Sequence, residues 1–414
     1  MSGSGPLDGL DDIDWAGLGH AYGSAEKVPE ALRALRSESA DERKAAMDEG
    51  LWHSIWHQGT RYPASVPAAR FLVRLAADPA TRDREQILFL LEALVTGYAS
   101  DHLPRGIDAA AWRADMEYRR ATDPEEQRRR LDTWVDEASD EVMRSWRKRR
   151  QEKFDPVAEL RRLEIELEVY DAVRAGVPAL RPLLDDQDSA VRAGVVRLLA
   201  WFPEEAAESV PMLDGLLDRE TDDLVISELI SALGLLGHRP AVPLFRDFLY
   251  GDLFHRLAAA VALIALDEVD ETVVGAIAHA AATAYWGDGG LPNPFSTIVS
   301  SRNTEDIMGL LEGCGVEDGS LGNALAGLRD GPPAWRAAMA AAALALAFGI
   351  VEDVTQVADE PEPFEDLDDE QRETVLALAG QPPEVWEGPG FRRLLNTWGL
   401  PEDRAALREY AGFD

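Results

Sequence analysis

Several features that mark common classes of protein are missing from this chain of 414 residues. Its single cysteine, Cys314, excludes an intrachain disulfide framework and any site built from several thiolates. No stretch approaches the roughly 20 consecutive apolar residues of a membrane span, and even the alanine-rich run 337–348 is too short. Residues 1–6 have neither the basic nor the apolar region of a secretory signal. These absences lead us to expect a cytoplasmic protein.

Basic residues are also scarce relative to acidic ones. The chain has 41 Lys and Arg against 76 Asp and Glu, a formal net charge of -35. Such a charge repels nucleic acids and anionic membranes at long range, and it attracts basic partners. The composition is nevertheless that of a folded protein, because 46% of the residues are hydrophobic.

A Val-Pro dipeptide followed by leucines recurs along the chain. Proline at the first turn of a helix costs nothing, because the N–H that it lacks would have no helical partner there. Each dipeptide therefore predicts the start of a helix. The first two dipeptides are 38 residues apart, the last three are 33 and 32 residues apart, and 111 residues separate the two groups: Val28-Pro29, Val66-Pro67, Val177-Pro178, Val210-Pro211 and Val242-Pro243.

Acidic residues follow these first helices and precede a second apolar helix. Asp188 and Asp222 stand where an N-cap is needed, and Gly237 stands where a second helix would end. Each unit is therefore predicted to be a helical hairpin. A single hairpin of this size cannot bury its apolar faces alone, so the units are expected to stack on one another.

The pattern of the unit beginning at Val177-Pro178 resembles the HEAT repeat. Its second helix has Asp188, Val191, Arg192 and Val195 at the spacing of that repeat, in the shorter bacterial form found in phycobilin-lyase-type proteins. Segments 13–23, 54–60, 369–372 and 399–404 also resemble a group of actinobacterial HEAT-repeat proteins. The resemblance implies an all-α fold, an α-solenoid of stacked helical hairpins, and it implies little about chemistry.

The array is interrupted in places, which suggests a division into segments. A charged stretch predicts long helices, a Gly/Pro-rich stretch a loop, and an acidic stretch an exposed linker before a C-terminal helical cap. The predicted segments are 1–103 (N-terminal hairpins), 104–170 (charged insertion), 171–285 (core repeats), 286–303 (loop), 304–358 (further hairpins), 359–370 (linker) and 371–414 (cap).

Two of these interruptions could carry a function. The basic run from Arg144 to Arg162 fits either a nucleic-acid patch or a solvated helix face whose arginines pair with carboxylates of the same chain. The second interpretation is favoured. The loop near Trp286 contains glycines but is followed by no Gly-Lys-Ser/Thr, so it predicts no phosphate site.

The sequence offers few residues for catalysis. His53 and His57 are four residues apart and are predicted to share one helix face, but Ser54 stands where a metalloprotease has glutamate. The chain has no His-Glu dipeptide, whereas HEAT-repeat di-iron hydroxylases bind their metal through such pairs. It also has no Gly-x-Ser-x-Gly motif, which carries the nucleophilic serine of α/β-hydrolases. We predict no metal, no cofactor and no catalytic residue, and whether the chain is an enzyme stays open.

Three functions follow from these observations. The leading hypothesis is a non-enzymatic scaffold that binds a basic protein or peptide on a concave solenoid surface, such as an immunity-type protein or a regulatory adaptor. The alternative is a small-molecule-binding protein or lyase-like enzyme using segment 52–62 and the loop at 286–302; the third is a DNA-binding HEAT protein. The candidate binding residues are Trp52, His53, Trp56, His57, Gln58, Tyr62, Arg192, Glu228, His255 and Trp286.

Overall fold

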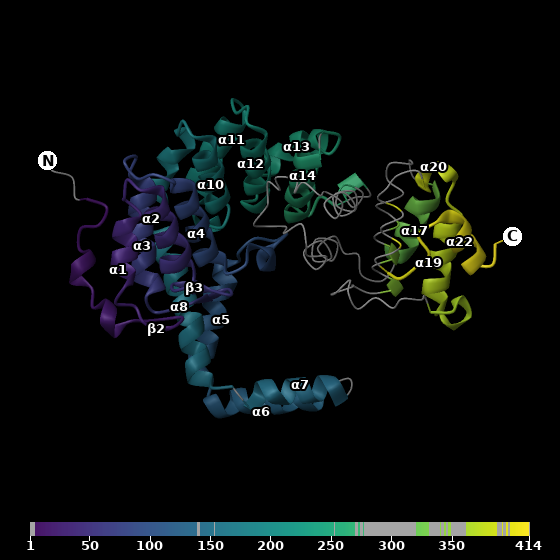
Figure 1. Ribbon diagram of the computed structural model, residues 1–414, viewed down its shortest axis with the longest axis horizontal. Helices are drawn as coiled ribbons and strands as arrows, with labels where there is room; N and C mark the ends of the chain where they lie inside the picture. The colour runs from purple at the N-terminus through teal and green to yellow at the C-terminus, as the bar shows by residue number, and fades with distance from the viewer. Residues whose placement is uncertain are drawn as a thin grey trace. The chain divides into compact units, whose positions relative to one another are not determined.

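The computed structural model divides the chain into two compact units (Figure 1). Unit 1 consists of Met1–Ala99 and Ile107–Leu213, and unit 2 of Ser100–Gly106 and Asp214–Asp414. The structure describes residues 5–138, 141–152, 154–251, 253–269, 272–273, 276, 320–330, 340, 343–344, 347–348, 362–386, 391, 395 and 398–413. The predicted loop 286–303, with Trp286, and Cys314 lie outside the described residues. The segment boundaries drawn from the sequence stay a prediction.

Unit 1 is helical apart from two short β-hairpins. Its first part contains η1 (Leu10–Asp12), η2 (Trp15–Gly17), β1 (Gly19–His20), β2 (Gly23–Ser24), α1 (Val28–Ala34), α2 (Ala40–Ala45), the π-helix η3 (Ala46–Trp52), β3 (Trp56–His57), β4 (Thr60–Arg61), α3 (Ser65–Ala77) and α4 (Arg84–Thr96). Its second part contains α5 (Ala109–Ala121), α6 (Pro124–Asp136), α7 (Glu141–Glu152), α8 (Pro156–Arg174), α9 (Val177–Leu180), η5 (Arg181–Asp185), α10 (Ser189–Leu199) and η6 (Pro203–Glu205).

The α3–α4 hairpin lies at the centre of unit 1. Helix α3 packs against α1, α8 and α9, and α4 packs against α8 and α10. Leu72 and Leu75 of α3, with Leu91 and Leu94 of α4, are completely buried. The core is therefore built from neighbouring hairpins that cover each other's apolar faces, as stacked repeats require.

Four of the five Val-Pro dipeptides begin a helix, as predicted. Helices α1, α9 and α13 (Val242–Phe248) start at the valine, and α3 starts one residue earlier. The prediction is wrong at Val210-Pro211, because α11 (Ala206–Leu217) begins four residues before it and contains Pro211 in its interior. Helix η6 directly precedes α11, so the chain is already helical before the dipeptide is reached.

The predicted helix ends are confirmed. The Asp188 carboxylate accepts a hydrogen bond from the Ala190 N–H at 3.0 Å at the start of α10. Gly237 follows α12 (Asp223–Leu235) with φ of 78°, and the His238 N–H donates to the Leu233 carbonyl at 2.9 Å. This is a Schellman motif, in which glycine adopts the left-handed conformation without strain.

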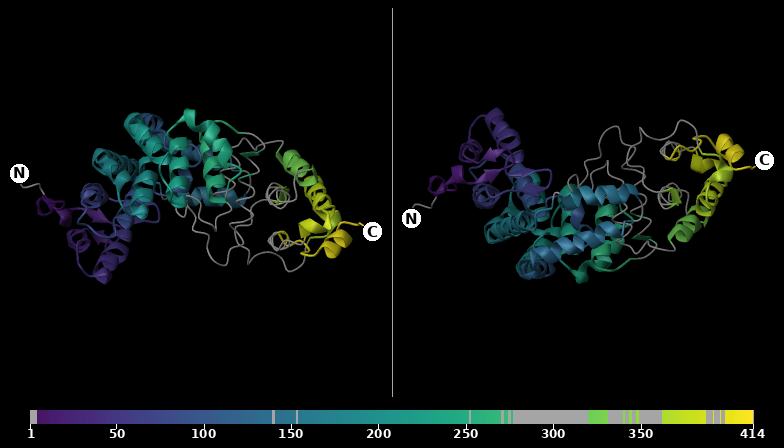
Figure 2. Two further views of the ribbon diagram at one scale, coloured as in Figure 1. Left: turned by 90° about the horizontal axis from the view of Figure 1, so that it is seen from above. Right: turned by 90° about the horizontal axis from the view of Figure 1, so that it is seen from below.

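The charged segment between α4 and α9 folds into long helices. Helices α5 and α8 pack against each other, and α6 and α7 form an antiparallel pair (Figures 1 and 2). Figure 1 shows that this pair lies away from the stacked hairpins of unit 1. We call residues 109–162 of these four helices the arm.

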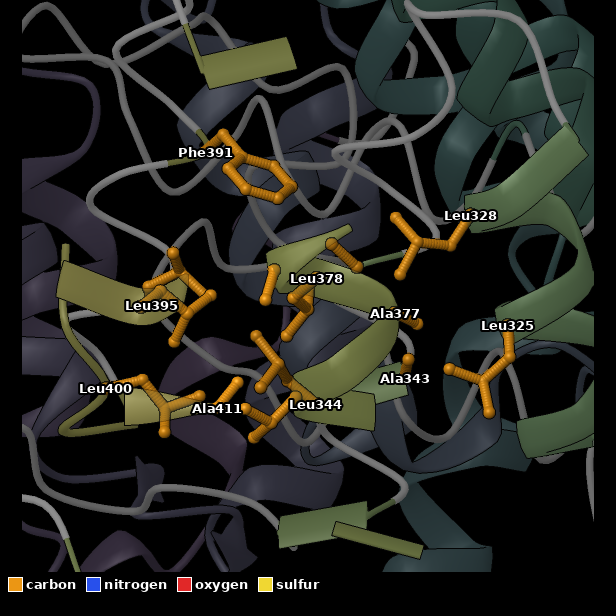
Figure 3. Packing of buried hydrophobic residues seen from close by; sticks show 14 of the residues in the cluster. Leu325, Leu328, Ala343, Leu344, Ala377, Leu378, Phe391, Leu395, Leu400 and Ala411 are labelled. Atoms are coloured by element: carbon orange, nitrogen blue, oxygen red, sulfur yellow. The ribbon is translucent and has the colours of Figure 1, made fainter. Parts of the chain in front are cut away.

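Unit 2 contains a tightly packed helix pair and a C-terminal helical cluster. Its helices are α12, η7 (Arg239–Ala241), α13, α14 (Leu253–Ala265), α17 (Ser320–Asp330), η9 (Phe364–Asp366), α19 (Asp369–Ala379), α20 (Pro383–Trp386) and α22 (Arg404–Tyr410). Helix α12 packs closely on α14, because Gly234 leaves room for the backbone of Ala262. Leu325 of α17, Leu378 of α19 and Ala411 after α22 meet in one apolar core (Figure 3). None of the described helices is long and apolar enough to span a membrane.

Candidate interaction surface at the paired β-hairpins

Unit 1 contains the same local structure twice, a β-hairpin followed by a helix with Val-Pro in its first turn. In β1–β2 His20 pairs with Gly23, and in β3–β4 His57 pairs with Thr60. Each histidine is the last residue of the first strand of its hairpin. The repeat was not found from the sequence, although His20 and His57 precede their Val-Pro dipeptides by nearly the same interval.

The two β-hairpins lie side by side. The Ala21 N–H donates to the Ser54 carbonyl at 3.0 Å, and the Ala64 N–H donates to the Gly19 carbonyl at 3.1 Å. The predicted helix containing both His53 and His57 is therefore wrong, because η3 ends at Trp52 and β3 begins at Trp56. The chain turns between the two histidines to bring β3–β4 beside β1–β2.

The turn of the second hairpin explains two residues of the predicted cluster. Gln58 and Gly59 both have positive φ, 49° and 77°, as the central residues of a type I′ turn require. A Cβ atom at Gly59 would lie 2.7 Å from Tyr98 Cε2, so glycine allows the turn to pack against that ring. The Gln58 side chain is exposed.

Behind the hairpins, aromatic rings pack in a continuous group. Trp52 contacts Trp56 edge to face at 5.1 Å between ring centroids and also contacts Phe89 at 5.2 Å. Trp56 contacts Tyr98 at 5.6 Å, and its indole N–H donates to the Gly97 carbonyl at 3.2 Å. These two tryptophans therefore join the hairpin to α4 and to the residues that follow it, which is a packing role.

The outer surface of the hairpins presents tyrosine and histidine side chains. Tyr22 is 68% exposed, yet its ring contacts the His57 ring at 5.4 Å, and the Tyr22 hydroxyl lies 3.5 Å from His57 Nδ1. His20 is 6.5 Å from Tyr22 between ring centroids, and its Nδ1 accepts the Tyr22 N–H at 3.0 Å. Burial and the nearby Tyr22 raise the pKa of Tyr62. We call Tyr22, His20 and His57 the aromatic ledge.

The ledge has a rigid support. Arg61 of β4 forms an ion pair with Glu166 of α8 at 3.3 Å, and both side chains are largely buried. The same guanidinium donates to the Gly59 carbonyl at 2.5 Å, across the turn of the hairpin. A buried arginine that bonds to both the turn and α8 fixes the hairpin on the helical stack.

The remaining predicted binding residues lie elsewhere. His53 is exposed, with Nδ1 2.6 Å from the Asp48 carbonyl. Arg192 of α10 donates to the carbonyls of Asp186 and Gln187, so it holds the turn of its own hairpin. Glu228 of α12 is 1% exposed and lies inside the molecule rather than on a surface; His255 of α14 is 9% exposed and packs on Phe248.

The donor set of the ledge does not form a metal centre. Among the described residues, no group of three or more His, Cys, Asp or Glu side chains is placed to hold a metal ion. A cavity in the arm and another beside Arg113 are lined by other residues. The ledge is an open surface suited to contact with a second molecule through rings and imidazole nitrogens.

Comparison with known protein families agrees with the fold. Residues 158–234 match the family model for HEAT repeats, a span running from α8 into α12. The chain thus contains HEAT repeats, as the sequence resemblance implied, and its fold is an all-α solenoid. HEAT repeats commonly mediate contacts between proteins. No curated protein matches the chain.

Proposed function

We propose that this HEAT-repeat chain is a non-enzymatic scaffold that binds a protein or peptide partner, and that the aromatic ledge is part of its contact surface. The observation that carries the proposal is Tyr22, 68% exposed but held against His57 on a supported hairpin. A large ring that is fixed before binding loses little conformational entropy in a complex, and tyrosine is enriched at the centres of interfaces.

The partner in this proposal is basic, and the protein acts in the cytoplasm. A net charge of -35 steers cations toward the surface and speeds their association. The single cysteine fits a reducing compartment. Within the proposal the protein belongs to the short bacterial, actinobacterial HEAT type and serves as an immunity-type protein or a regulatory adaptor.

The contacts around segment 52–62 favour a scaffold over an enzyme. The Trp56 indole and His53 Nδ1 both bond to backbone carbonyls of the chain, so these groups stabilise the fold. The nucleic-acid hypothesis is weakened in a similar way. Arg161 pairs with Glu168 at 2.7 Å, and Arg162 pairs with Glu159 at 2.7 Å. A phosphate would have to compete with these carboxylates for the two arginines.

A comparative pull-down tests the proposal. The tagged full chain and a Tyr22→Ala/His57→Ala variant are used to capture proteins from the native host at low and at moderate salt. Tyr250→Ala is the matched control, because Tyr250 is 76% exposed and belongs to unit 2. We expect at least one basic protein that the wild type and the control capture and the double variant does not.

The captured protein is then purified and titrated against all three forms. Truncating a tyrosine at the centre of an interface weakens binding about tenfold or more, so the ledge variant should lose at least that factor. Equal affinity of the ledge variant and the wild type would contradict the role of the ledge. Failure of the wild type to capture any protein at either salt concentration would contradict the scaffold itself.

A further inference from the structure

The arm of unit 1 encloses a cleft that the proposed ledge surface does not use. Its volume is about 990 Å³, large enough for several side chains of a peptide. The cleft lies among α5, α6, α7 and α8, whose arrangement is shown in Figure 1. Its lining combines rings and charges: Asp115, Tyr118, Arg119, Thr122, Gln127, Arg130, Leu131, Trp134, Arg150, Phe154, Asp155, Ala158, Glu159 and Arg162.

Aromatic rings form part of the lining and are fixed by cations of the arm. Tyr118 is 49% exposed, and the Arg130 guanidinium lies 5.4 Å from its centroid. Arg147 lies 4.9 Å from the Trp134 centroid and donates to the Trp134 carbonyl at 2.5 Å. The arrangement keeps apolar ring surface available in a cleft that is otherwise polar, as in binding sites for peptides.

Most charges that line the cleft are already paired with each other. Arg162 donates to both oxygens of Glu159, at 3.0 and 2.7 Å, and this hydrogen-bonded pair lowers the pKa of Glu159. Arg119 pairs with Asp115 at 2.5 Å. These groups provide a polar wall, but they contribute little net charge for attracting a ligand.

Helix α7 has a net positive charge, and two of its cations, Lys148 and Arg149, lie at its exposed face. Residues 144–150 include five Lys or Arg and no Asp or Glu, in a chain whose net charge is -35. Lys148 and Arg149 are exposed, and within the described part of the chain neither has a carboxylate within 4.0 Å. Arg150 lines the cleft and lies 4.9 Å from the Trp146 centroid. Trp146 itself is 42% exposed on the same helix.

We propose that the cleft and the adjoining face of α7 bind an acidic peptide segment of a partner protein. Carboxylates of the peptide pair with Lys148, Arg149 and Arg150, and its aromatic or aliphatic side chains enter the cleft against Tyr118 and Trp134. The charge of α7 is opposite to that of the chain as a whole, so this surface selects the opposite kind of partner from the rest of the protein.

The composition of the cleft favours a peptide over a nucleic acid. Asp115 and Glu159 neutralise two of the arginines that line it, so the cleft offers a phosphodiester backbone little net positive charge. A peptide can place its own acids on α7 and its apolar side chains against the rings of the cleft, so it uses both parts of the surface. Large exposed rings next to arginines also match the composition of protein interfaces.

Selection from a displayed library of random linear peptides tests the proposal. The full chain serves as bait, and Lys148→Glu/Arg149→Glu serves as the counter-selected form. The control variant, Lys27→Glu/Arg70→Glu, makes the same change of charge at exposed positions of unit 1 outside the arm. We expect enriched peptides with a net negative charge and at least one large apolar side chain.

The enriched peptides are then titrated by fluorescence anisotropy, alongside a duplex DNA. The arm variant should bind the peptides at least about tenfold more weakly, while the control variant binds them within about twofold of the wild type. Tyr118→Ala should weaken binding without changing its salt dependence. Enrichment of neutral or basic peptides, indifference to the arm variant, or arm-dependent binding of DNA without acidic peptides would overturn the proposal. Because Tyr22 is unchanged in these variants, the result is independent of the ledge.

Discussion

Arg197 of α10 reaches across to Glu92 of α4, with Nε 2.8 Å from Oε2. The Trp201 indole N–H donates to the other carboxylate oxygen, Oε1, at 3.1 Å. Glu92 is 2% exposed, and burial raises its pKa while Arg197 lowers it. Helices α4 and α10 of unit 1 are thus joined by an ion pair whose carboxylate is almost completely buried.

Replacing Arg197 with methionine should destabilise the protein strongly. Methionine keeps most of the apolar volume, but it leaves Glu92 buried without its cation, a change that costs about 3–5 kcal/mol. The midpoint of urea unfolding, followed by circular dichroism, measures the loss. The double variant Glu92→Gln/Arg197→Met should recover much of it, because no buried charge remains. An Arg197→Met chain as stable as the wild type would contradict this account of the pair.

The loss should also depend on pH. A carboxyl group whose pKa is raised by folding is protonated more readily in the folded state, so stability falls as the pH rises above the unfolded value of about 4.3. Without Arg197 the pKa of Glu92 rises further, and the fall is larger. The difference between variant and wild type should therefore be greatest near neutral pH and smallest in acid. The double variant, which cannot titrate at this position, is the control.

Much of the helical array could be predicted from the sequence because its signals are local. A proline at a helix start, an aspartate at an N-cap such as Asp188, and a glycine at a helix end such as Gly237 act within one turn of the chain. The prediction failed at Val210-Pro211 because the chain is already helical before this dipeptide. A two-residue pattern contains no information about the conformation of the residues that precede it.

The candidate site was harder to predict because it depends on contacts between distant residues. Tyr22 and His57 meet only when the two β-hairpins pair, and the strands are too short to give an alternating pattern. Arg192 and Glu228 occupied the expected positions on second helices, but spacing alone does not show whether a side chain faces its own turn, the interior or solvent.

A second prediction concerns the packing of α12 on α14. A Cβ atom at Gly234 would lie 2.3 Å from the Cα atom of Ala262, and a backbone atom cannot move aside as a flexible side chain can. Gly234→Ala should therefore destabilise unit 2 by at least about 1–3 kcal/mol, the usual cost of overpacking. The urea midpoint of the full chain should fall.

Gly215 provides the matched control in α11. A Cβ atom there would meet nothing within 4 Å, and the residue lies inside a helix. Gly215→Ala should leave the stability unchanged or raise it by about 0.5–1 kcal/mol, because alanine loses less backbone entropy on folding. Equal destabilisation by both substitutions would show that the close contact at Ala262 is not the cause.

A third prediction separates stability from binding at Arg192. Its guanidinium donates to the carbonyls of Asp186 at 2.8 Å and Gln187 at 3.3 Å, and Arg43 makes the same kind of contact with the turn between α1 and α2. Arg192→Ala should cost about 1.5–3 kcal/mol, the range for hydrogen bonds to a charged group. Arg192→Lys should recover only part, because an ammonium group lacks the planar fork.

Binding provides the decisive comparison for Arg192. If the side chain serves only to hold its turn, Arg192→Ala should bind the ledge partner with the affinity of the wild type at a temperature where both are folded. A variant with unchanged stability and weakened binding would instead assign Arg192 to the contact surface, as the sequence pattern suggested.

The last prediction concerns stability in alkali. Tyr170 of α8 is completely buried between Trp112 and Phe202, and its hydroxyl donates to Glu204 Oε2 at 2.5 Å. Burial and the hydrogen bond to Glu204 raise the pKa of Tyr170, because both favour the neutral hydroxyl. The stability that this provides is complete below the unfolded pKa of about 10 and is lost as the pH rises above it.

Urea midpoints measured between about pH 8 and about pH 10.5 should therefore fall more steeply for the wild type than for Tyr170→Phe. At the lower pH the variant should be less stable by about 1 kcal/mol, since it loses one hydrogen bond. The two stability curves should then converge as the pH rises, because only the wild type must either keep a buried hydroxyl protonated or unfold to ionise it. Parallel curves would contradict this account, because they would mean that folding does not change the ionisation of Tyr170.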